Sequence, residues 1–148
     1  MNRDIFSKLS DLNPISLTIL RVVTALLFMQ HGLQKMFGWP PGGFDTGPFE
    51  LFSLVGCAAA MELVGGALLV LGFLTRPVAF LLAGQMAVAY FMVHFASGIG
   101  KPGGFFPVTN GGDLSVLFCF VFLHLFISGP GAMSLDARVK SHSDVSNR

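Results

Sequence analysis

The 148-residue chain is 53% hydrophobic and only 11% charged, and its formal net charge is +1. A soluble domain of this length could not bury so much apolar surface, so the composition predicts an integral membrane protein. The small net charge gives no electrostatic reason to expect a nucleic-acid partner. The expected environment of the chain is therefore a lipid bilayer.

Four apolar stretches follow one another along the sequence, each near the roughly 20 residues that cross a ~30 Å hydrocarbon core. They predict helices over about 15–37, 49–74, 77–97 and 113–128. The fourth is short and needs flanking glycines to span a membrane. The expected fold is all-α: an integral membrane four-helix bundle over residues 1–136, followed by a short polar cytoplasmic tail over 137–148.

The connections between these helices differ in length. Two Gly- and Pro-rich loops, 38–48 and 98–112, follow the first and third helices, whereas only Thr75 and Arg76 separate the second from the third. On this plan the basic residues on one side are Arg3, Lys8, Arg76, Arg138, Lys140 and Arg148, against Lys35 and Lys101 on the other. The positive-inside rule then predicts cytoplasmic N and C termini and two outward-facing loops.

Both outward loops carry aromatic side chains, namely Trp39, Phe44, Phe105 and Phe106. Aromatic residues are enriched at membrane–water boundaries, so these four suit an interfacial belt. A second interpretation is that the loops fold back over the bundle as a lid.

Helical spacing predicts which side chains face the bundle. Glu62 shares a face with small residues of the second helix, which favours a position between helices. His94 continues an alanine stripe on the third helix, and Asp113 shares a face with Phe120 and His124 on the fourth. On the first helix, one face carries Arg21, Ala25, Phe28, Gly32 and Lys35, with His31 one turn before Lys35. We expect each helix to turn these polar groups inward.

Depth in the membrane suggests how the groups pair. A rise of about 1.5 Å per residue places Arg21 roughly 10 Å from the cytoplasmic ends, Glu62 roughly 18 Å, and both His31 and His94 roughly 25 Å. An ionised carboxylate at this depth needs a partner, so we predict an ion pair of Arg21 with Glu62. Toward the outer side we predict a polar cluster of His31, His94, Gln30, Gln34, Lys35 and Asp113.

Structural explanations stand beside the functional one. Arg21 and Lys35 could each simply reach the nearer headgroups, and His94 and His124 could be hydrogen-bonded core residues. A carboxylate within the membrane indicates a functional site, although an ion pair that only fixes helix register would also explain Glu62. No metal site is predicted, because the sequence lacks paired ligand motifs and His31, His94 and Glu62 would have to assemble from three helices.

Several short segments resemble one known family. In chain order they are Leu20-Arg21, Gln30-His31-Gly32-Leu33-Gln34-Lys35, Glu62-Leu63-Val64-Gly65-Gly66, Leu71-Gly72-Phe73-Leu74-Thr75-Arg76 and Gly129-Pro130-Gly131-Ala132-Met133-Ser134-Leu135-Asp136. Together they resemble the DoxX family of small bacterial membrane proteins, over nearly the whole chain. One departure is Asp113, where relatives often carry glutamate.

The resemblance implies a four-helix protein of the bacterial inner (plasma) membrane. It also implies a link to redox chemistry, since relatives are connected to thiosulfate:quinone oxidoreductase as a membrane subunit and to a complex that handles oxidative stress. The sequence shows no recognisable motif for flavin, haem or an iron–sulfur cluster, so a redox role needs a quinone-like substrate or a partner protein that carries the electrons.

Two functions remain open. In the first, the chain is a membrane subunit of a quinone-linked oxidoreductase: a quinone or small sulfur compound enters a cavity lined by His31, Lys35, Glu62 and His94. Glu62 or His31 exchanges protons with it, Arg21 holds the charge of Glu62, and Lys35 attracts an anion. In the second, the chain is a non-catalytic membrane anchor or a small-solute transporter. Small-residue faces on two helices also suit a homodimer.

Overall fold

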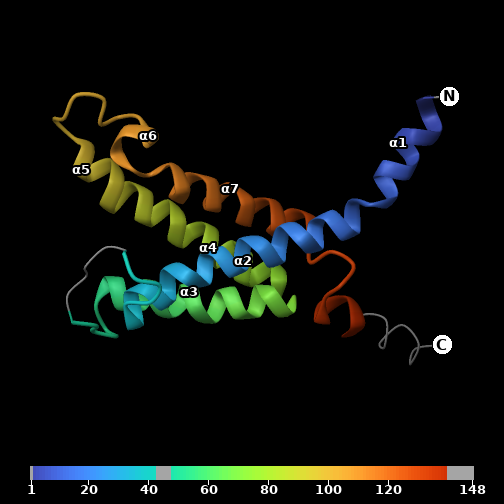
Figure 1. Ribbon diagram of the computed structural model, residues 1–148, viewed down its shortest axis with the longest axis horizontal. Helices are drawn as coiled ribbons and strands as arrows, with labels where there is room; N and C mark the ends of the chain where they lie inside the picture. Colours follow the sequence, from blue (N-terminus) through green and yellow to red (C-terminus); the bar gives the residue numbers. More distant parts are fainter. Residues whose placement is uncertain (1, 43–47, 140–148) are drawn as a thin grey trace.

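The computed structural model describes residues 2–42 and 48–139, and every regular element within these ranges is a helix (Figure 1). In chain order they are α1 (Asn2–Asp11), α2 (Asn13–Phe37), α3 (Leu54–Leu71), α4 (Thr75–Ala89), the π-helix η1 (Tyr90–Phe95), α5 (Ala96–Gly98), α6 (Pro107–Asn110) and α7 (Asp113–Ser128). The expected belt residue Phe44 and tail residues 140–148 lie outside the described ranges.

Three helical runs in the described part of the chain are long and apolar enough to cross a bilayer. They are α2, α3 and the continuous run of α4, η1 and α5 from Thr75 to Gly98. The fourth apolar helix, α7, has 16 residues. At 1.5 Å per residue that is about 24 Å, which is shorter than a typical hydrocarbon core. The all-α prediction is confirmed, with three long apolar helices and one shorter apolar helix.

Two helix pairs form the body of the molecule: α2 packs chiefly on α3, and α4 packs chiefly on α7. The first pair is close because glycines lie at the contact. A Cβ atom on Gly32 would lie 2.8 Å from the carbonyl oxygen of Ala59, and one on Gly66 would lie 2.4 Å from Cγ of Met29. Small residues let two helix backbones approach in this way inside a membrane.

The two pairs meet through apolar side chains. Leu82 of α4 fills the space over Gly65 of α3, where an added Cβ would lie 2.9 Å from its Cδ2 atom. Phe28 of α2 reaches α7, and its ring centroid lies 5.2 Å from that of Phe118 and 4.9 Å from that of Phe122. These contacts place Phe28 and Phe122, which are 1% and 0% exposed, at the centre of the core.

The second helix is shorter than the predicted 49–74. Ser53 is its N-cap, and the hydroxyl of Ser53 accepts a hydrogen bond from the amide of Gly56 at 3.0 Å. At the other end Gly72 adopts the left-handed conformation, with φ +66°, and the next amide, of Phe73, donates to the carbonyl of Leu68. The helix predicted from hydropathy is longer than α3 because apolar residues continue beyond both caps.

The third apolar run is not uniformly α-helical. After Ala89 the chain forms the π-helix η1, which continues into α5. A π-helical turn widens the helix and is often found at functional sites. Hydropathy does not distinguish the two helix types, so the sequence predicted one uninterrupted helix here.

The predicted inward face of the fourth helix is wrong. Asp113 and His124 are exposed, and Phe120 is 66% exposed. The buried face of α7 instead carries Ser115, Phe118, Phe122 and Leu125. Tilted and edge-on ring contacts of Phe28 with the two buried phenylalanines fix this rotation of the helix, whereas helical spacing alone allowed either face.

The two ends of the molecule differ in what they carry. In Figure 1, α1 and the segment after α7 lie at one end, while the start of α3 lies with α5 and α6 at the other. At the latter end Trp39, Phe105 and Phe106 are 61%, 73% and 59% exposed. Such exposure is typical of an interfacial belt and differs from the buried packing expected of a lid.

Candidate functional site

An ion pair between α2 and α3 lies at the centre of the candidate site. The ammonium of Lys35 lies 2.5 Å from Oε1 of Glu62, and the side chains are 30% and 1% exposed respectively. Glu62 is therefore a buried charge. Its partner Lys35 reaches it from the end of the molecule that carries α5 and α6. Burial of a carboxylate among apolar helices is costly without such a partner.

Helix geometry explains why Lys35 is the partner. Gly32 lies against α3 at the level of Glu62, where an added Cβ would lie 3.1 Å from Cβ of Glu62. Side chains on a helix lean toward its N-terminus. Because α2 and α3 run in opposite directions, Lys35 leans back toward Glu62 and Glu62 leans toward Lys35.

Gln85 of α4 completes the cluster and was missed by the sequence analysis. Its Nε2 donates to the carbonyl of Ala58 at 3.1 Å and to Oε1 of Glu62 at 3.3 Å. The sequence does indicate it, because Gln85 is a lone amide within the apolar stretch from Phe80 to Tyr90. We refer to Lys35, Glu62 and Gln85 as the polar cluster.

Two acceptor atoms of the polar cluster have no partner in the part of the chain that the structure describes. Oε2 of Glu62 and Oε1 of Gln85 are buried and accept no hydrogen bond from these residues. A buried polar atom without a partner costs free energy, typically about 1–3 kcal/mol. Unpaired buried acceptors of this kind call for a hydrogen-bond donor, such as water or a bound ligand.

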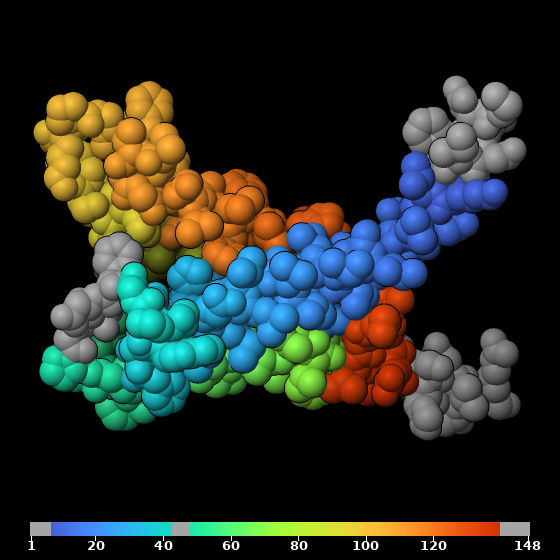
Figure 2. All heavy atoms as spheres, viewed as in Figure 1, coloured from blue at the N-terminus to red at the C-terminus, as the bar shows by residue number. Residues whose placement is uncertain are grey.

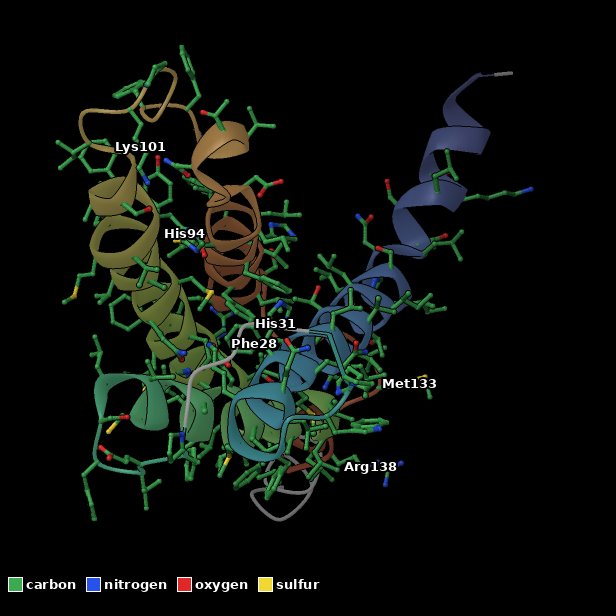
Figure 3. The ribbon with its side chains drawn as sticks, turned by 60° about the vertical axis from the view of Figure 1, so that its left-hand side comes forward. Phe28, His31, His94, Lys101, Met133 and Arg138 are labelled. Carbon is green, nitrogen blue, oxygen red and sulfur yellow. The ribbon has the colours of Figure 1, made fainter. Side chains whose placement is uncertain are left out.

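His31 lies next to the polar cluster on α2, one turn before Lys35. Its Nδ1 lies 3.0 Å from the carbonyl of Leu27, and its ring meets that of Phe118 edge-on at 5.8 Å. Figure 3 shows His31 beside Phe28, close to the core where α2 meets α7. In the neutral ring, Nδ1 donating to the carbonyl leaves Nε2 as an acceptor.

The predicted pair of Arg21 with Glu62 is wrong. Arg21 is 0% exposed, and among the described residues the partners of its guanidinium are all backbone carbonyls. Those of Leu69 and Val70 belong to the last turn of α3, and those of Pro130 and Met133 belong to the segment after α7. A cation at a helix C-terminus is favoured by the helix dipole and satisfies carbonyls that have no helical partner.

The predicted depths of Arg21 and Glu62 misled the pairing because the two helices do not begin at the same level. α2 has 25 residues and α3 has 18, so α2 is longer by about 10 Å at 1.5 Å per residue. Arg21, eight residues into α2, therefore lies level with the end of α3. The same count from a common plane had placed it near Glu62.

The segment after α7 is fixed to α2 and to the start of α4. Asp136 accepts hydrogen bonds from the amides of Leu74 and Thr75, at 2.9 and 2.8 Å, at the start of α4. The amide of Met133 donates to the hydroxyl of Thr18 on α2 at 3.2 Å. Together with Arg21, these contacts make the Gly129–Asp136 segment a structural clasp.

The other predicted site residues lie away from the polar cluster. Nδ1 of His94 on η1 lies 3.3 Å from the carbonyl of Asn110, and Nε2 of Gln34 donates to the carbonyl of Pro40 at 2.9 Å. Gln30 and Asp113 are exposed. Within the described ranges, no three of the His, Cys, Asp and Glu side chains gather as a metal site would require. The predicted outer cluster is therefore wrong as one group, and only Lys35 and the adjacent His31 lie near Glu62.

Comparison with known proteins agrees with this architecture. The DoxX family model matches residues 16–95. An uncharacterized protein of Haemophilus influenzae is 40% identical over 132 residues, covering 88% of this chain and 95% of that protein. The Escherichia coli "Inner membrane protein YphA" is 33% identical, covering 84% and 91%, and the Bacillus subtilis "Putative oxidoreductase CatD" is 28% identical, covering 89% and 95%. No solved structure matches.

The apolar helices and the inner-membrane relatives define the class: a multi-pass protein of the bacterial inner membrane. Within that class the chain belongs to the DoxX family, whose model covers more than half of its length.

Proposed function

We propose that the protein is a membrane subunit of a redox system and that the polar cluster binds the head group of a quinone-type carrier. The observation that carries the proposal is the pair of unpartnered buried acceptors, Oε2 of Glu62 and Oε1 of Gln85, beside an ion pair. The relative named "Putative oxidoreductase CatD" supports the redox part of the proposal.

The two free acceptors favour a neutral ligand that donates hydrogen bonds. A hydroxyl group of the reduced carrier, a quinol, would donate to Oε2 of Glu62. An anionic sulfur compound brings further acceptors, and Lys35, the cation expected to attract it, already pairs with Glu62. Of the two substrate classes predicted from sequence, the quinone-type carrier is therefore the better match to the cluster.

Glu62 would act as the proton acceptor in this site. When the carrier is oxidised, two electrons leave to a redox group on a partner protein, the hydroxyl that donates to Oε2 passes one proton to the carboxylate, and the second hydroxyl releases its proton to water. Lys35 uses one of its three N–H groups on Glu62. Its remaining donors could then bind the carbonyl oxygen of the oxidised carrier.

The charge distribution supports a topology for this proposal. Arg138 lies with α1 at one end, and Lys101 lies at the other (Figure 3). Arg76, at the start of α4, donates to the carbonyl of Phe126 near the end of α7. By the positive-inside rule the first end is cytoplasmic, with both termini, and the two Gly- and Pro-rich loops face outward. Lys35 then reaches Glu62 from the outer half of the membrane.

Mass spectrometry of the bound molecules tests the function. The protein would be extracted from native membranes in mild detergent, and its small molecules and co-purifying proteins identified. We expect a quinone-type carrier with the wild-type protein and at least about ten-fold less with Glu62→Gln, because a hydrogen bond to a charged group contributes roughly 1.5–3 kcal/mol.

A matched control separates binding from folding. His124→Leu removes an exposed polar side chain of α7 far from the cluster and should retain the carrier. Thermal melting of all variants checks that they fold. Lipid alone in the wild-type protein, with no quinone and no redox partner, would overturn the proposal and leave the membrane anchor or solute transporter as the function.

A further inference from the structure

The loop between α5 and α7 forms a second candidate site at the end of the molecule opposite the chain termini. It is folded by its own backbone: the amide of Lys101 donates to Gly98 and that of Gly104 donates to Lys101, both at 3.0 Å. The side chain of Asn110 donates to the carbonyl of Gly104 at 3.0 Å. The loop thus has a defined shape that can hold a ligand.

At Gly98 and Gly104 two parts of the loop backbone come into close contact. A Cβ on Gly98 would lie 2.3 Å from the carbonyl oxygen of Gly104, and one on Gly104 would lie 2.0 Å from that of Gly98. No other residue type fits at either position without moving backbone. The close approach shapes a pocket of about 220 Å³.

The pocket walls combine apolar and cationic groups. Its side chains are Phe95, Ile99, Lys101 and Phe105, together with three glycines of the loop. The rings of Phe95 and Phe105 meet edge-on, with centroids 6.3 Å apart. Among the described residues no carboxylate pairs with Lys101, so its ammonium is an uncompensated positive charge beside aromatic walls.

Two apolar side chains of the pocket walls are exposed. Ile99 and Phe105 are 70% and 73% exposed. They lie on the segment that projects beyond α7 at the upper left of Figure 2, at the end of the apolar helices. Apolar side chains at this level lie in the headgroup region of a bilayer, where aromatic residues concentrate.

We propose that this pocket binds the head group of an anionic phospholipid from the adjacent leaflet. Lys101 pairs with the phosphate, and the glycerol and upper acyl carbons lie against Phe95, Ile99 and Phe105. Charge complementarity favours an anionic lipid over a zwitterionic one, because the pocket offers a cation and no carboxylate. The proposal does not depend on the redox function of the polar cluster.

The test uses full-length protein in vesicles that contain phosphatidylglycerol and phosphatidylethanolamine. Lipids retained after mild extraction are counted by native mass spectrometry. We expect about five-fold less retained phosphatidylglycerol for Lys101→Gln, the effect of one basic residue at an anionic surface. Phe105→Ser, which leaves the charge unchanged, should also lower retention.

Lys8→Gln is the matched control, because Lys8 is an exposed lysine on α1 at the other end of the molecule. It should retain phosphatidylglycerol as the wild type does. Equal losses in Lys8→Gln and Lys101→Gln, or no loss in either, would overturn the proposal. A soluble phosphate source is tested with glycerol phosphate: if it displaces the lipid from the wild type at millimolar concentration, the pocket is a free-phosphate site and the lipid assignment is wrong.

Discussion

Glu62 is the residue on which the site depends, and its charge depends on Lys35. Lys35→Met would leave the carboxylate without its cation inside the protein. We expect a loss of roughly 2 kcal/mol of stability, below the 3–5 kcal/mol of a fully buried pair because Lys35 is partly exposed. Thermal melting in detergent measures it.

The double variant Lys35→Met with Glu62→Gln checks the cause. If the single substitution is destabilising because it leaves the Glu62 carboxylate unpaired, removing that charge should restore most of the melting temperature. Equal destabilisation in the single and double variants would instead show that Lys35 contributes by packing.

Arg21 carries a structural prediction. Arg21→Gln keeps some hydrogen-bonding capacity but cannot reach the carbonyls of both α3 and the clasp, so several buried acceptors lose their donor. We expect destabilisation of about 3 kcal/mol or more. Arg138→Gln, at an exposed position, should melt like the wild type, and a similar loss in both variants would contradict the structural role of Arg21.

The site could be predicted from sequence only in part. Glu62 stood out because a carboxylate in an apolar helix beside glycines must face another helix. Its partner was predicted wrongly because the relative position of α2 and α3 along the membrane normal depends on how they pack, and the sequence of one helix does not determine it. Gln85 was missed because it lies outside the alanine stripe that predicted the inward face of the third helix, although an amide in an apolar helix has the same need for a partner as an ionisable group.

Among the elements, the α2–α3 pair rests on glycine contacts. Gly32→Val places a branched side chain against the backbone of α3 and would push Lys35 away from Glu62. Overpacking of this kind typically costs about 1–3 kcal/mol. Melting temperature and quinone retention should both fall.

Gly84 is the control for that substitution, since a Cβ there meets no atom within 4 Å. Gly84→Ala should be neutral or slightly stabilising, because alanine favours a helix by about 1 kcal/mol relative to glycine. If Gly32→Val were equally harmless, close packing of α2 on α3 would not be what positions Lys35.

Element positions were predictable where hydropathy and caps agree. α7 was predicted at the residues where it occurs, Asp113–Ser128, because glycines bound its apolar run on both sides. α3 was predicted too long, since apolar residues continue past Ser53 and Gly72, and η1 was not foreseen because π-helical hydrogen bonding leaves no mark on hydropathy.

For the whole molecule, orientation in the membrane is the prediction to test. Val108 and Met133 are 78% and 73% exposed. Val108 belongs to α6 and Met133 to the segment after α7, and these lie at opposite ends of the molecule (Figures 1 and 3). In a background without Cys57 and Cys119, a membrane-impermeant maleimide should label Val108→Cys in intact cells and Met133→Cys only after permeabilisation. The reverse pattern would invert the proposed topology.

The most direct test of the polar cluster is a binding titration with purified protein in nanodiscs. A short-tailed quinol should bind the wild type, bind at least about ten-fold more weakly to Glu62→Gln and Gln85→Leu, and be unaffected by thiosulfate. Equal quinol affinity in all three proteins, or displacement of the quinol by thiosulfate, would contradict a neutral donor ligand at Glu62 and Gln85.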